Sequence, residues 1–435
     1  MESPITVDKL RFVLYRFKEK LWIKPAGFCV ISILAVFIAK FADGTELAPH
    51  LPEVDAESVK TLLSIMASSM MVIATFSAGT MVNAYASASQ SSTPRSLSLI
   101  ISDDVSQNAL SVFIGAFIYS AVALTAMSNA FFEQAGVFTL FVLTCIAFAI
   151  VILTFIRWVD SVARLGRVGS TVLKVEKATQ RAIENRIKAP CLGAVPSRAI
   201  SQSKQSKLKE QGTHGVFSKR VGYIQLIDTA RIQQWACEND AFVDVTMLPG
   251  EFVTPDKVLA YVNKNDDLTT IEHAFTISEE RSFEADPRFG FVVLAEIASR
   301  ALSPAINDHG TAISIISSVT RLMLLWKTSE CSSPLKQEQN DKDYQYNRVS
   351  VPELNVNDLF DDAYTSISRD GAGNIEVAIH IQKSLKSISS CFGKDSEFKN
   401  SATNFARQSF ERSKQALAFS DDIERLRKYS SENQK

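Results

Sequence analysis

The chain has 435 residues, more than a single hydrophobic core usually organises, so we expect two or three folding units. Its 46 Lys and Arg residues nearly balance 47 Asp and Glu residues, which does not indicate a nucleic-acid-binding protein. With 46% hydrophobic residues it is not a disordered chain either. Most of the long uncharged apolar runs lie within residues 1–160, whereas residues 161–435 have the composition of a soluble domain.

Four apolar segments have the roughly 20 residues that a helix needs to cross the hydrocarbon core of a bilayer. They are residues 23–41, 62–85, 109–127 and 136–158. Basic residues resist translocation, and they gather before the first segment and after the fourth. These flanking residues are Lys9, Arg11, Arg16, Lys18, Lys20, Lys24, Arg157, Arg164 and Arg167. We therefore predict a four-helix transmembrane domain over residues 1–160 in the inner membrane, with both termini in the cytoplasm.

The fourth segment shows no turn signal at its end. Apolar residues continue at helical spacing, so residues 161–189 are predicted to extend the helix as far as the breaker Ala189-Pro190. If this helix bends, Gly166 and Gly169 are the expected positions. Residues 190–220 are rich in Ser, Lys, Gln and Gly, and are predicted to form a flexible linker.

The second segment is unusual because hydroxyl and small side chains occupy one arc of the helix, while Leu63, Met66 and Met70 occupy the other side. Two interpretations stay open. Small residues let helices pack closely, and hydroxyl groups can line a water-filled or ion-conducting path. The candidate residues under either interpretation are Ser64, Ser68, Thr75, Gly79 and Asn83.

The soluble region, residues 221–435, begins with short strands. Residues 222–226 and 241–245 have strand patterns, and residues 248–262 resemble the hairpin of a biotinyl/lipoyl-type sandwich, so a β part is predicted over residues 221–265. A helical part is predicted over residues 285–430. The predicted fold is an α+β membrane protein with four transmembrane helices and a cytoplasmic α/β domain, which combines a small sandwich-like part with helices.

Two helix starts lie close together in the helical part. Asp286-Pro287 predicts an N-cap and first turn, Ser303-Pro304 ends that helix, and Asn307-Asp308 predicts the cap of the next. The polar residues here either serve only as caps or form a pocket for an anion or small ligand, since amides at helix starts point outward. The pocket candidates are Arg281, Asp286, Arg300, Asn307, Asp308 and His309. Further helices are predicted over residues 356–369, 374–391 and 397–428.

Residues 301–308, Ala-Leu-Ser-Pro-Ala-Ile-Asn-Asp, resemble a family of predicted bacterial membrane proteins, domain of unknown function 2254. Residues 75–77, 113–119, 222–224 and 249–253 are similar to the same family, in the same order. The resemblance implies four membrane spans and a cytoplasmic domain, and it carries no catalytic residues.

The sequence shows no plausible combination of a nucleophile with a base, no phosphate-binding loop and no Cys-x-x-Cys pair. We therefore expect neither enzymatic activity nor a bound metal or cofactor. The expected partners are the lipid bilayer, further copies of the chain in a homo-oligomer, and an ion or small-molecule ligand, but no nucleic acid. Two functions remain. In the first, the protein is an oligomeric channel or transporter that is regulated by its cytoplasmic domain. In the second, the membrane helices only anchor a cytoplasmic assembly that binds a ligand or partner, without transport.

Overall fold

The computed structural model describes residues 22–44, 51–101, 104–164, 166–197, 213–264, 267–327 and 344–430. These residues form two compact units, which are considered separately. The N-terminal unit ends at Thr171 and the C-terminal unit begins at Val172.

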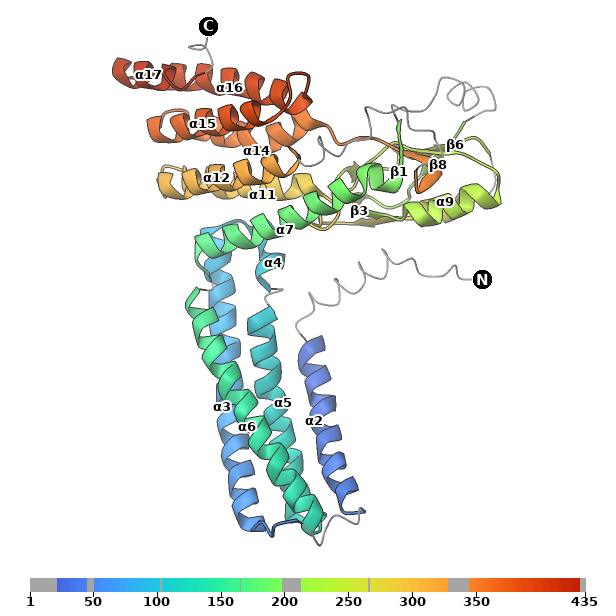
Figure 1. Ribbon diagram of the computed structural model, residues 1–435, viewed down its shortest axis with the longest axis vertical. Helices are drawn as coiled ribbons and strands as arrows, with labels where there is room; N and C mark the ends of the chain where they lie inside the picture. The colour runs from blue at the N-terminus through green and yellow to red at the C-terminus, as the bar shows by residue number, and fades with distance from the viewer. Residues whose placement is uncertain are drawn as a thin grey trace. The chain divides into compact units, whose positions relative to one another are not determined.

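The N-terminal unit contains four helices that are long and apolar enough to cross a membrane (Figure 1). They are α2 (Ile23–Ala42), α3 (Ala56–Ser91), α5 (Asp104–Ser128) and α6 (Gln134–Arg164). The four predicted spans are therefore confirmed as helices. A 3-10 turn, η2 (Pro94–Ser96), and the short helix α4 (Leu97–Ile101) lead from α3 towards α5.

Helix α5 packs against α2, α3 and α6, and its contacts with α2 and α3 are the most extensive of this unit. Its Phe113 is fully buried, and its Tyr119 hydroxyl lies 3.0 Å from Thr144 Oγ1 and 3.2 Å from the Leu140 carbonyl oxygen of α6. Buried polar groups in an apolar bundle need such partners. The contact therefore fixes how α5 and α6 face each other.

Asp43, at the end of α2, caps a different helix. Its carboxylate accepts hydrogen bonds from the backbone N–H groups of Glu133, at 3.0 Å, and Gly136, at 2.5 Å, at the start of α6. A Cβ at position 136 would lie 2.7 Å from either carboxylate oxygen, so only glycine allows this approach. The anion satisfies free N–H groups and faces the positive end of the helix dipole.

The predicted extension of the fourth span is interrupted. Helix α6 ends at Arg164, and α7 (Val168–Lys188) begins after Gly166, whose φ of +80° is left-handed. A side chain there would also meet the Ala84 carbonyl oxygen of α3 at 3.2 Å. Glycine is thus required at this joint for both its conformation and its close contact.

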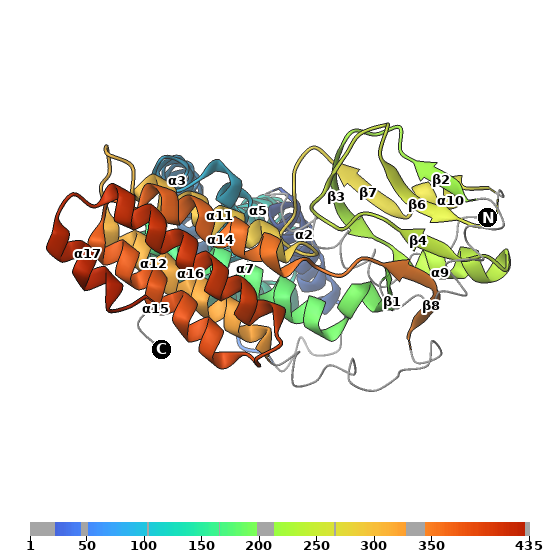
Figure 2. The same cartoon turned by 90° about the horizontal axis from the view of Figure 1, so that it is seen from above.

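The C-terminal unit contains two sheets and a bundle of helices (Figure 2). The five-stranded sheet has the order β1 (Ala194–Pro196), β8 (Tyr346–Val351), β4 (Val243–Val245), β6 (Val258–Val262), β2 (His214–Phe217). The three-stranded sheet has the order β5 (Phe252–Val253), β3 (Gly222–Ile227), β7 (Phe275–Ser278). Near the strands lie η3 (Pro190–Gly193), α9 (Thr229–Glu238) and α10 (Thr269–Glu272), and Trp235 of α9 belongs to their common core.

The sheets differ from two predictions. Strand β5 pairs with β3, whereas β6 pairs with β4 and β2, so residues 248–262 form no hairpin, and a biotinyl/lipoyl-type sandwich is not shown. Backbone bonds between Gly250 and Ile224, and between Ile224 and Glu251, hold this segment to β3 before the chain turns into the other sheet. Residues 190–220, predicted as linker, contribute β1 and β2 within their described part.

The helical bundle consists of α11 (Pro287–Ala301), α12 (His309–Leu325), α14 (Val356–Asp370), α15 (Ile375–Cys391), α16 (Glu397–Ala416) and α17 (Ser420–Arg427). Helix α11 is largely buried, between α12 and α14. The helix predicted over residues 397–428 is divided at Leu417, whose extended backbone ends α16 and whose side chain is buried beside α15.

Replacing Asp43 with Ala leaves the N–H groups at the start of α6 without their acceptor and weakens the contact between α2 and α6. We expect a loss of about 1–2 kcal/mol and an apparent Tm lower by a few degrees, measured by thermal unfolding in detergent. Asp160→Ala is the control, because Asp160 pairs only with the exposed Arg164. Equal effects of the two substitutions would contradict the capping role of Asp43.

Candidate functional site

The outward face of α3 is the first candidate site. The side chains of Leu63, Met66, Met70 and Met81 are buried against the other helices of the unit, which leaves the polar arc on the outside. Of the predicted candidates, Ser64, Ser68, Thr75, Gly79 and Asn83 are all exposed. The hydroxyl groups therefore do not mediate packing within this chain.

The exposed hydroxyl groups of α3 differ in their hydrogen bonds. Ser68 Oγ donates to the Ser64 carbonyl oxygen at 2.5 Å, and Thr75 Oγ1 donates to the Met71 carbonyl oxygen at 2.9 Å. The side chains of Ser64, Ser69 and Asn83 have no hydrogen-bond partner within the described chain. Pure hydrocarbon is a poor environment for such groups.

The outward faces of α2 and α6 are different in kind. Both expose large aliphatic or aromatic side chains, as expected of surfaces adapted to lipid. On these two helices the exposed residues include Val30, Ile31, Leu34, Phe37, Ile38, Ile146, Ile150, Ile152, Leu153 and Ile156. The exposed surface of α3 differs from these because it combines hydroxyl groups with apolar side chains, namely Ile65, Met71, Val72, Phe76 and Val82.

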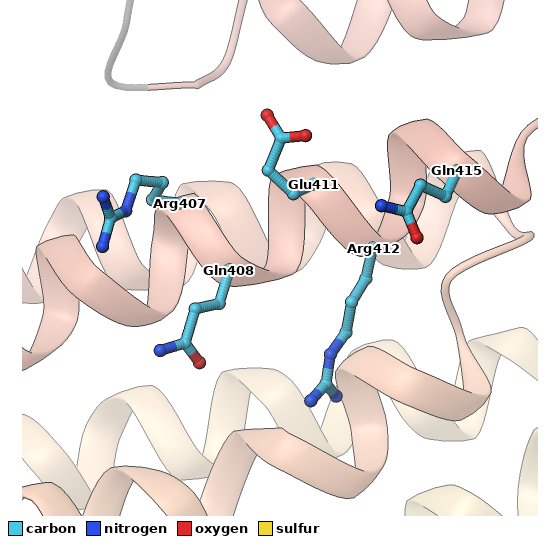
Figure 3. Close-up of a pocket in the computed structure, with 5 residues that line it drawn as sticks. All are labelled: Arg407, Gln408, Glu411, Arg412 and Gln415. Atoms are coloured by element: carbon cyan, nitrogen blue, oxygen red, sulfur yellow. The ribbon is translucent and has the colours of Figure 1, made fainter.

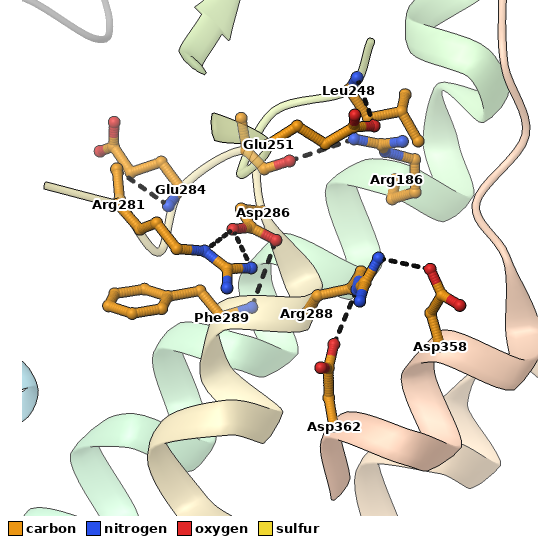
Figure 4. A network of polar contacts seen from close by, with 12 residues as sticks. Arg186, Leu248, Glu251, Arg281, Glu284, Asp286, Arg288, Phe289, Asp358 and Asp362 are labelled. Carbon is orange, nitrogen blue, oxygen red and sulfur yellow. Dashed lines mark hydrogen bonds and ion pairs between the residues drawn. The ribbon is translucent and has the colours of Figure 1, made fainter. Parts of the chain in front are cut away.

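The second candidate site surrounds Asp286 in the C-terminal unit (Figure 4). The Asp286 side chain is buried, with 3% of its surface exposed, and its carboxylate caps α11 by accepting a hydrogen bond from the Phe289 N–H. The carboxylate also forms an ion pair with Arg281, whose Nε and Nη2 lie 2.8 and 2.7 Å from it. Arg281 also lies 5.1 Å over the Phe289 ring. Burial raises the pKa of Asp286, and the adjacent Arg281 opposes this change. Gly250 packs directly on the carboxylate, where any Cβ would clash.

Two further arginines lie near this ion pair. Arg288 donates to Asp358 at 2.6 Å and to Asp362 at 2.7 Å, which fastens α11 to α14. Burial works to lower the pKa of Arg288, but the two carboxylates raise it. Arg186 of α7 is buried, and its Nη2 donates to the Ala285 carbonyl oxygen at 3.1 Å. Burial lowers the pKa of Arg186, and its Nη1 has no partner among the described residues.

The predicted ligand pocket is not assembled as one group. Asp308 caps α12 by accepting a hydrogen bond from the Thr311 N–H. A second hydrogen bond, from the Thr311 hydroxyl, lowers the pKa of Asp308. Asn307 has a left-handed φ of +53°, and Arg300 is exposed at the end of α11. The 15 residues of α11, about 22 Å of helix, separate Asp286 from these side chains and from His309, the first residue of α12. Asp286 and Asp308 are thus two separate caps.

The turn between α11 and α12 is exposed but tightly bonded. Backbone bonds run from the N–H groups of Ile306 and Asn307 to the Ser303 carbonyl oxygen, and from the Asp308 N–H to the Ala301 carbonyl oxygen. A shallow hollow of about 450 Å³ lies elsewhere, on the outer surface of α16 (Figure 3). One helix supplies all its lining residues, Arg407, Gln408, Glu411, Arg412 and Gln415, so it encloses no ligand.

The comparison with known proteins supports the membrane assignment. A family model described as "Predicted membrane protein (DUF2254)" matches residues 18–387. The chain belongs to this family. The resemblance drawn from residues 301–308 and the other matching segments is thereby confirmed. An uncharacterized protein of Mycobacterium tuberculosis is 30% identical over 105 residues, which cover 22% of this chain and 20% of that protein. The match therefore spans about a fifth of that relative. No solved structure matches the chain.

Sequence reasoning missed Arg186, Gly250, Arg288, Asp358 and Asp362. The partners of Arg288 lie 70 and 74 residues away, a separation at which no local pattern predicts pairing. Pro249-Gly250 did signal a turn, but it did not indicate that a carboxylate packs on the glycine.

Replacing Asp286 with Ala removes a cap and leaves the half-buried Arg281 and the buried Arg186 without this counter-charge. We expect a loss of about 3–5 kcal/mol, measured as the free energy of unfolding of the C-terminal unit in the full chain. Asp308→Ala, which removes an exposed cap alone, should cost about 1 kcal/mol. Asp286→Asn separates the two effects, because it keeps a capping oxygen but removes the charge. Similar losses for Asp286→Ala and Asp308→Ala would show that the buried charge is not structurally important.

The Glu176–Arg321 pair, which fastens α7 to α12, provides a pH test. Both carboxylate oxygens accept from Arg321, at 2.7 and 2.8 Å, and this bonding lowers the pKa of Glu176. Because the folded-state pKa is depressed, the stabilisation is present above the unfolded pKa and is lost as the pH falls through the folded one.

We expect Glu176→Gln to cost about 1 kcal/mol at neutral pH and progressively less as the pH falls through the lowered pKa of Glu176, measured by thermal unfolding across this range. Glu184→Gln is the control, since Glu184 accepts only from Gln180. A loss that does not depend on pH would argue against an ionic contribution.

Proposed function

We propose that the protein is a homo-oligomeric channel or transporter for small ions in the inner membrane. Copies of α3 line the path, and both termini and the C-terminal unit lie in the cytoplasm. The observation that carries the proposal is the set of exposed hydroxyl groups on α3, among them the unpartnered Ser64 and Ser69, which stand between exposed apolar side chains of the same helix. An oligomer that turns α3 inward gives these groups water or ions in place of lipid.

The proposed orientation is supported by the distribution of charge. Basic residues flank the start of α2 and the end of α6, whereas Glu53, Asp55 and Glu57 precede or begin α3, with Lys60 the nearest basic residue. Lys and Arg favour the cytoplasmic side, and acidic residues have little influence. This distribution favours four spans with both ends inside.

A route for control of the path by the C-terminal unit runs through the joint between α6 and α7. Gly166 lies against the Ala84 carbonyl oxygen of α3, and α7 is held to α12 by the Glu176–Arg321 pair. A movement of α7 would therefore act on the end of α3. The proposal requires binding and passage of an ion but no covalent chemistry.

The direct test is ion flux into proteoliposomes that contain the purified protein. Ser68→Leu and Thr75→Leu fill the path with apolar groups and should reduce flux at least about tenfold, because an ion then loses its polar surroundings. Ser68→Thr keeps a hydroxyl and should retain flux. Cross-linking in membranes checks that each variant still assembles.

Thr125→Leu is the matched control, because Thr125 of α5 is an exposed threonine with the same bond to the carbonyl oxygen four residues earlier. Its flux should equal that of the wild type. Absence of flux above that of empty liposomes under every imposed ion gradient would refute conduction. It would favour the alternative of a membrane-anchored cytoplasmic scaffold.

A further inference from the structure

Helix α7 has two contrasting faces. One face is buried, with Val172, Val175 and Ile183 among its apolar residues, and Thr179 lies so close to Gly290 of α11 that no Cβ would fit there. The opposite face is basic, and its basic residues are exposed apart from the half-buried Lys174. Its basic residues, together with Arg167 just before the helix, are Arg167, Lys174, Lys177, Arg181 and Lys188.

These five residues line one side of the helix. Arg167, Lys174, Arg181 and Lys188 recur every seven residues, close to two helical turns, so they form a row about 30 Å long. Arg321 neutralises Glu176, so of the two acidic residues of α7 only Glu184, which accepts a hydrogen bond from the uncharged Gln180, offsets the five positive charges. The face, here called the basic face of α7, therefore carries a net positive charge.

The chain connects this basic face closely to a membrane span. Only residues 165–167 separate the end of α6 from the start of α7. The chain therefore keeps the first turns of α7 near the bilayer surface. Leu173, 56% exposed, stands on the same side of the helix as the basic residues. A basic helix with an exposed apolar residue beside a span fits a headgroup layer better than open water.

We propose that the basic face of α7 binds the anionic headgroups of the leaflet at which α6 ends. Phosphate groups of the lipid accept from Lys177 and Arg181, and Leu173 enters the headgroup layer. This role does not depend on conduction, because it needs only the span and the charge. Each basic residue near an anionic surface strengthens the attachment by about fivefold, and salt screens the attraction.

The test uses the full-length protein in nanodiscs. A background without the six native cysteines carries Leu173→Cys, and an uncharged, bulky maleimide reports how accessible the thiol is. Nanodiscs of phosphatidylcholine alone are compared with nanodiscs that also contain phosphatidylglycerol. We expect the anionic lipid to slow labelling several-fold, and we expect high salt to restore the rate.

Charge variants identify the source of the protection. Lys177→Gln with Arg181→Gln should remove most of it, whereas Arg407→Gln with Lys414→Gln, which removes two exposed positive charges from α16, should leave it intact. A thiol placed at Gln408 on α16 should label at one rate in both lipids. Equal labelling of Leu173→Cys in both nanodiscs overturns the proposal. If added RNA, rather than the anionic lipid, slows labelling of Leu173→Cys, the partner of the basic face is a soluble polyanion and the proposal is wrong.

Discussion

The buried pair of Asp286 and Arg281 is the contact on which the C-terminal unit depends. The carboxylate fixes the first turn of α11, Gly250 brings the three-stranded sheet against it, and the preceding residue supplies the carbonyl oxygen that holds Arg186 of α7. Removing two charges from water offsets most of their attraction, so such a pair adds little net stability. We infer that its role is to fix position instead, because the three-stranded sheet, α7 and α11 all make contacts at Asp286 or at the residue before it.

The same requirement, that buried polar groups find partners, shapes the N-terminal unit. Asp43 supplies the acceptor that the start of α6 lacks, and Tyr119 shares its hydroxyl with α6. Each of these contacts joins two helices whose apolar surfaces alone would allow many relative rotations. The bundle is thus oriented by a few polar contacts and filled by methionine, alanine and aromatic side chains.

The sequence predicted what local patterns determine. The four spans, the caps at Asp286 and Asp308, and the two sides of α3 follow from hydropathy and helical periodicity. It did not predict strand β8, which lies partly in a polar stretch and pairs in parallel with β1 and β4, far away in the chain. Strand partners and long-range ion pairs depend on the tertiary fold. The sequence therefore predicted the cap at Asp286 but not the contacts that Gly250 and Arg186 make around it.

The depth of the polar residues sharpens the argument about α3. This helix has 36 residues, about 54 Å, whereas the hydrocarbon core is about 30 Å thick. Phe76 contacts Trp158 of α6, with ring centroids 6.3 Å apart, so the charged Arg157 lies near the level of Thr75 and Phe76. Because Arg157 must reach the headgroups, we infer that the hydrocarbon covers α3 roughly from Glu57 to Phe76, which lies nearer the start of the helix than the predicted segment 62–85.

That depth separates the candidate residues on α3 into two groups. Gly79 and Asn83 then lie at the bilayer surface, where polar groups need no special explanation. Ser64, Ser68, Ser69 and Thr75 remain at hydrocarbon depth on an exposed face. The hydroxyl groups of Ser68 and Thr75 are tolerable in lipid, since each is bonded to its own helix. The unpartnered Ser64 and Ser69 therefore give the strongest reason for expecting another copy of the chain, or water, against this face.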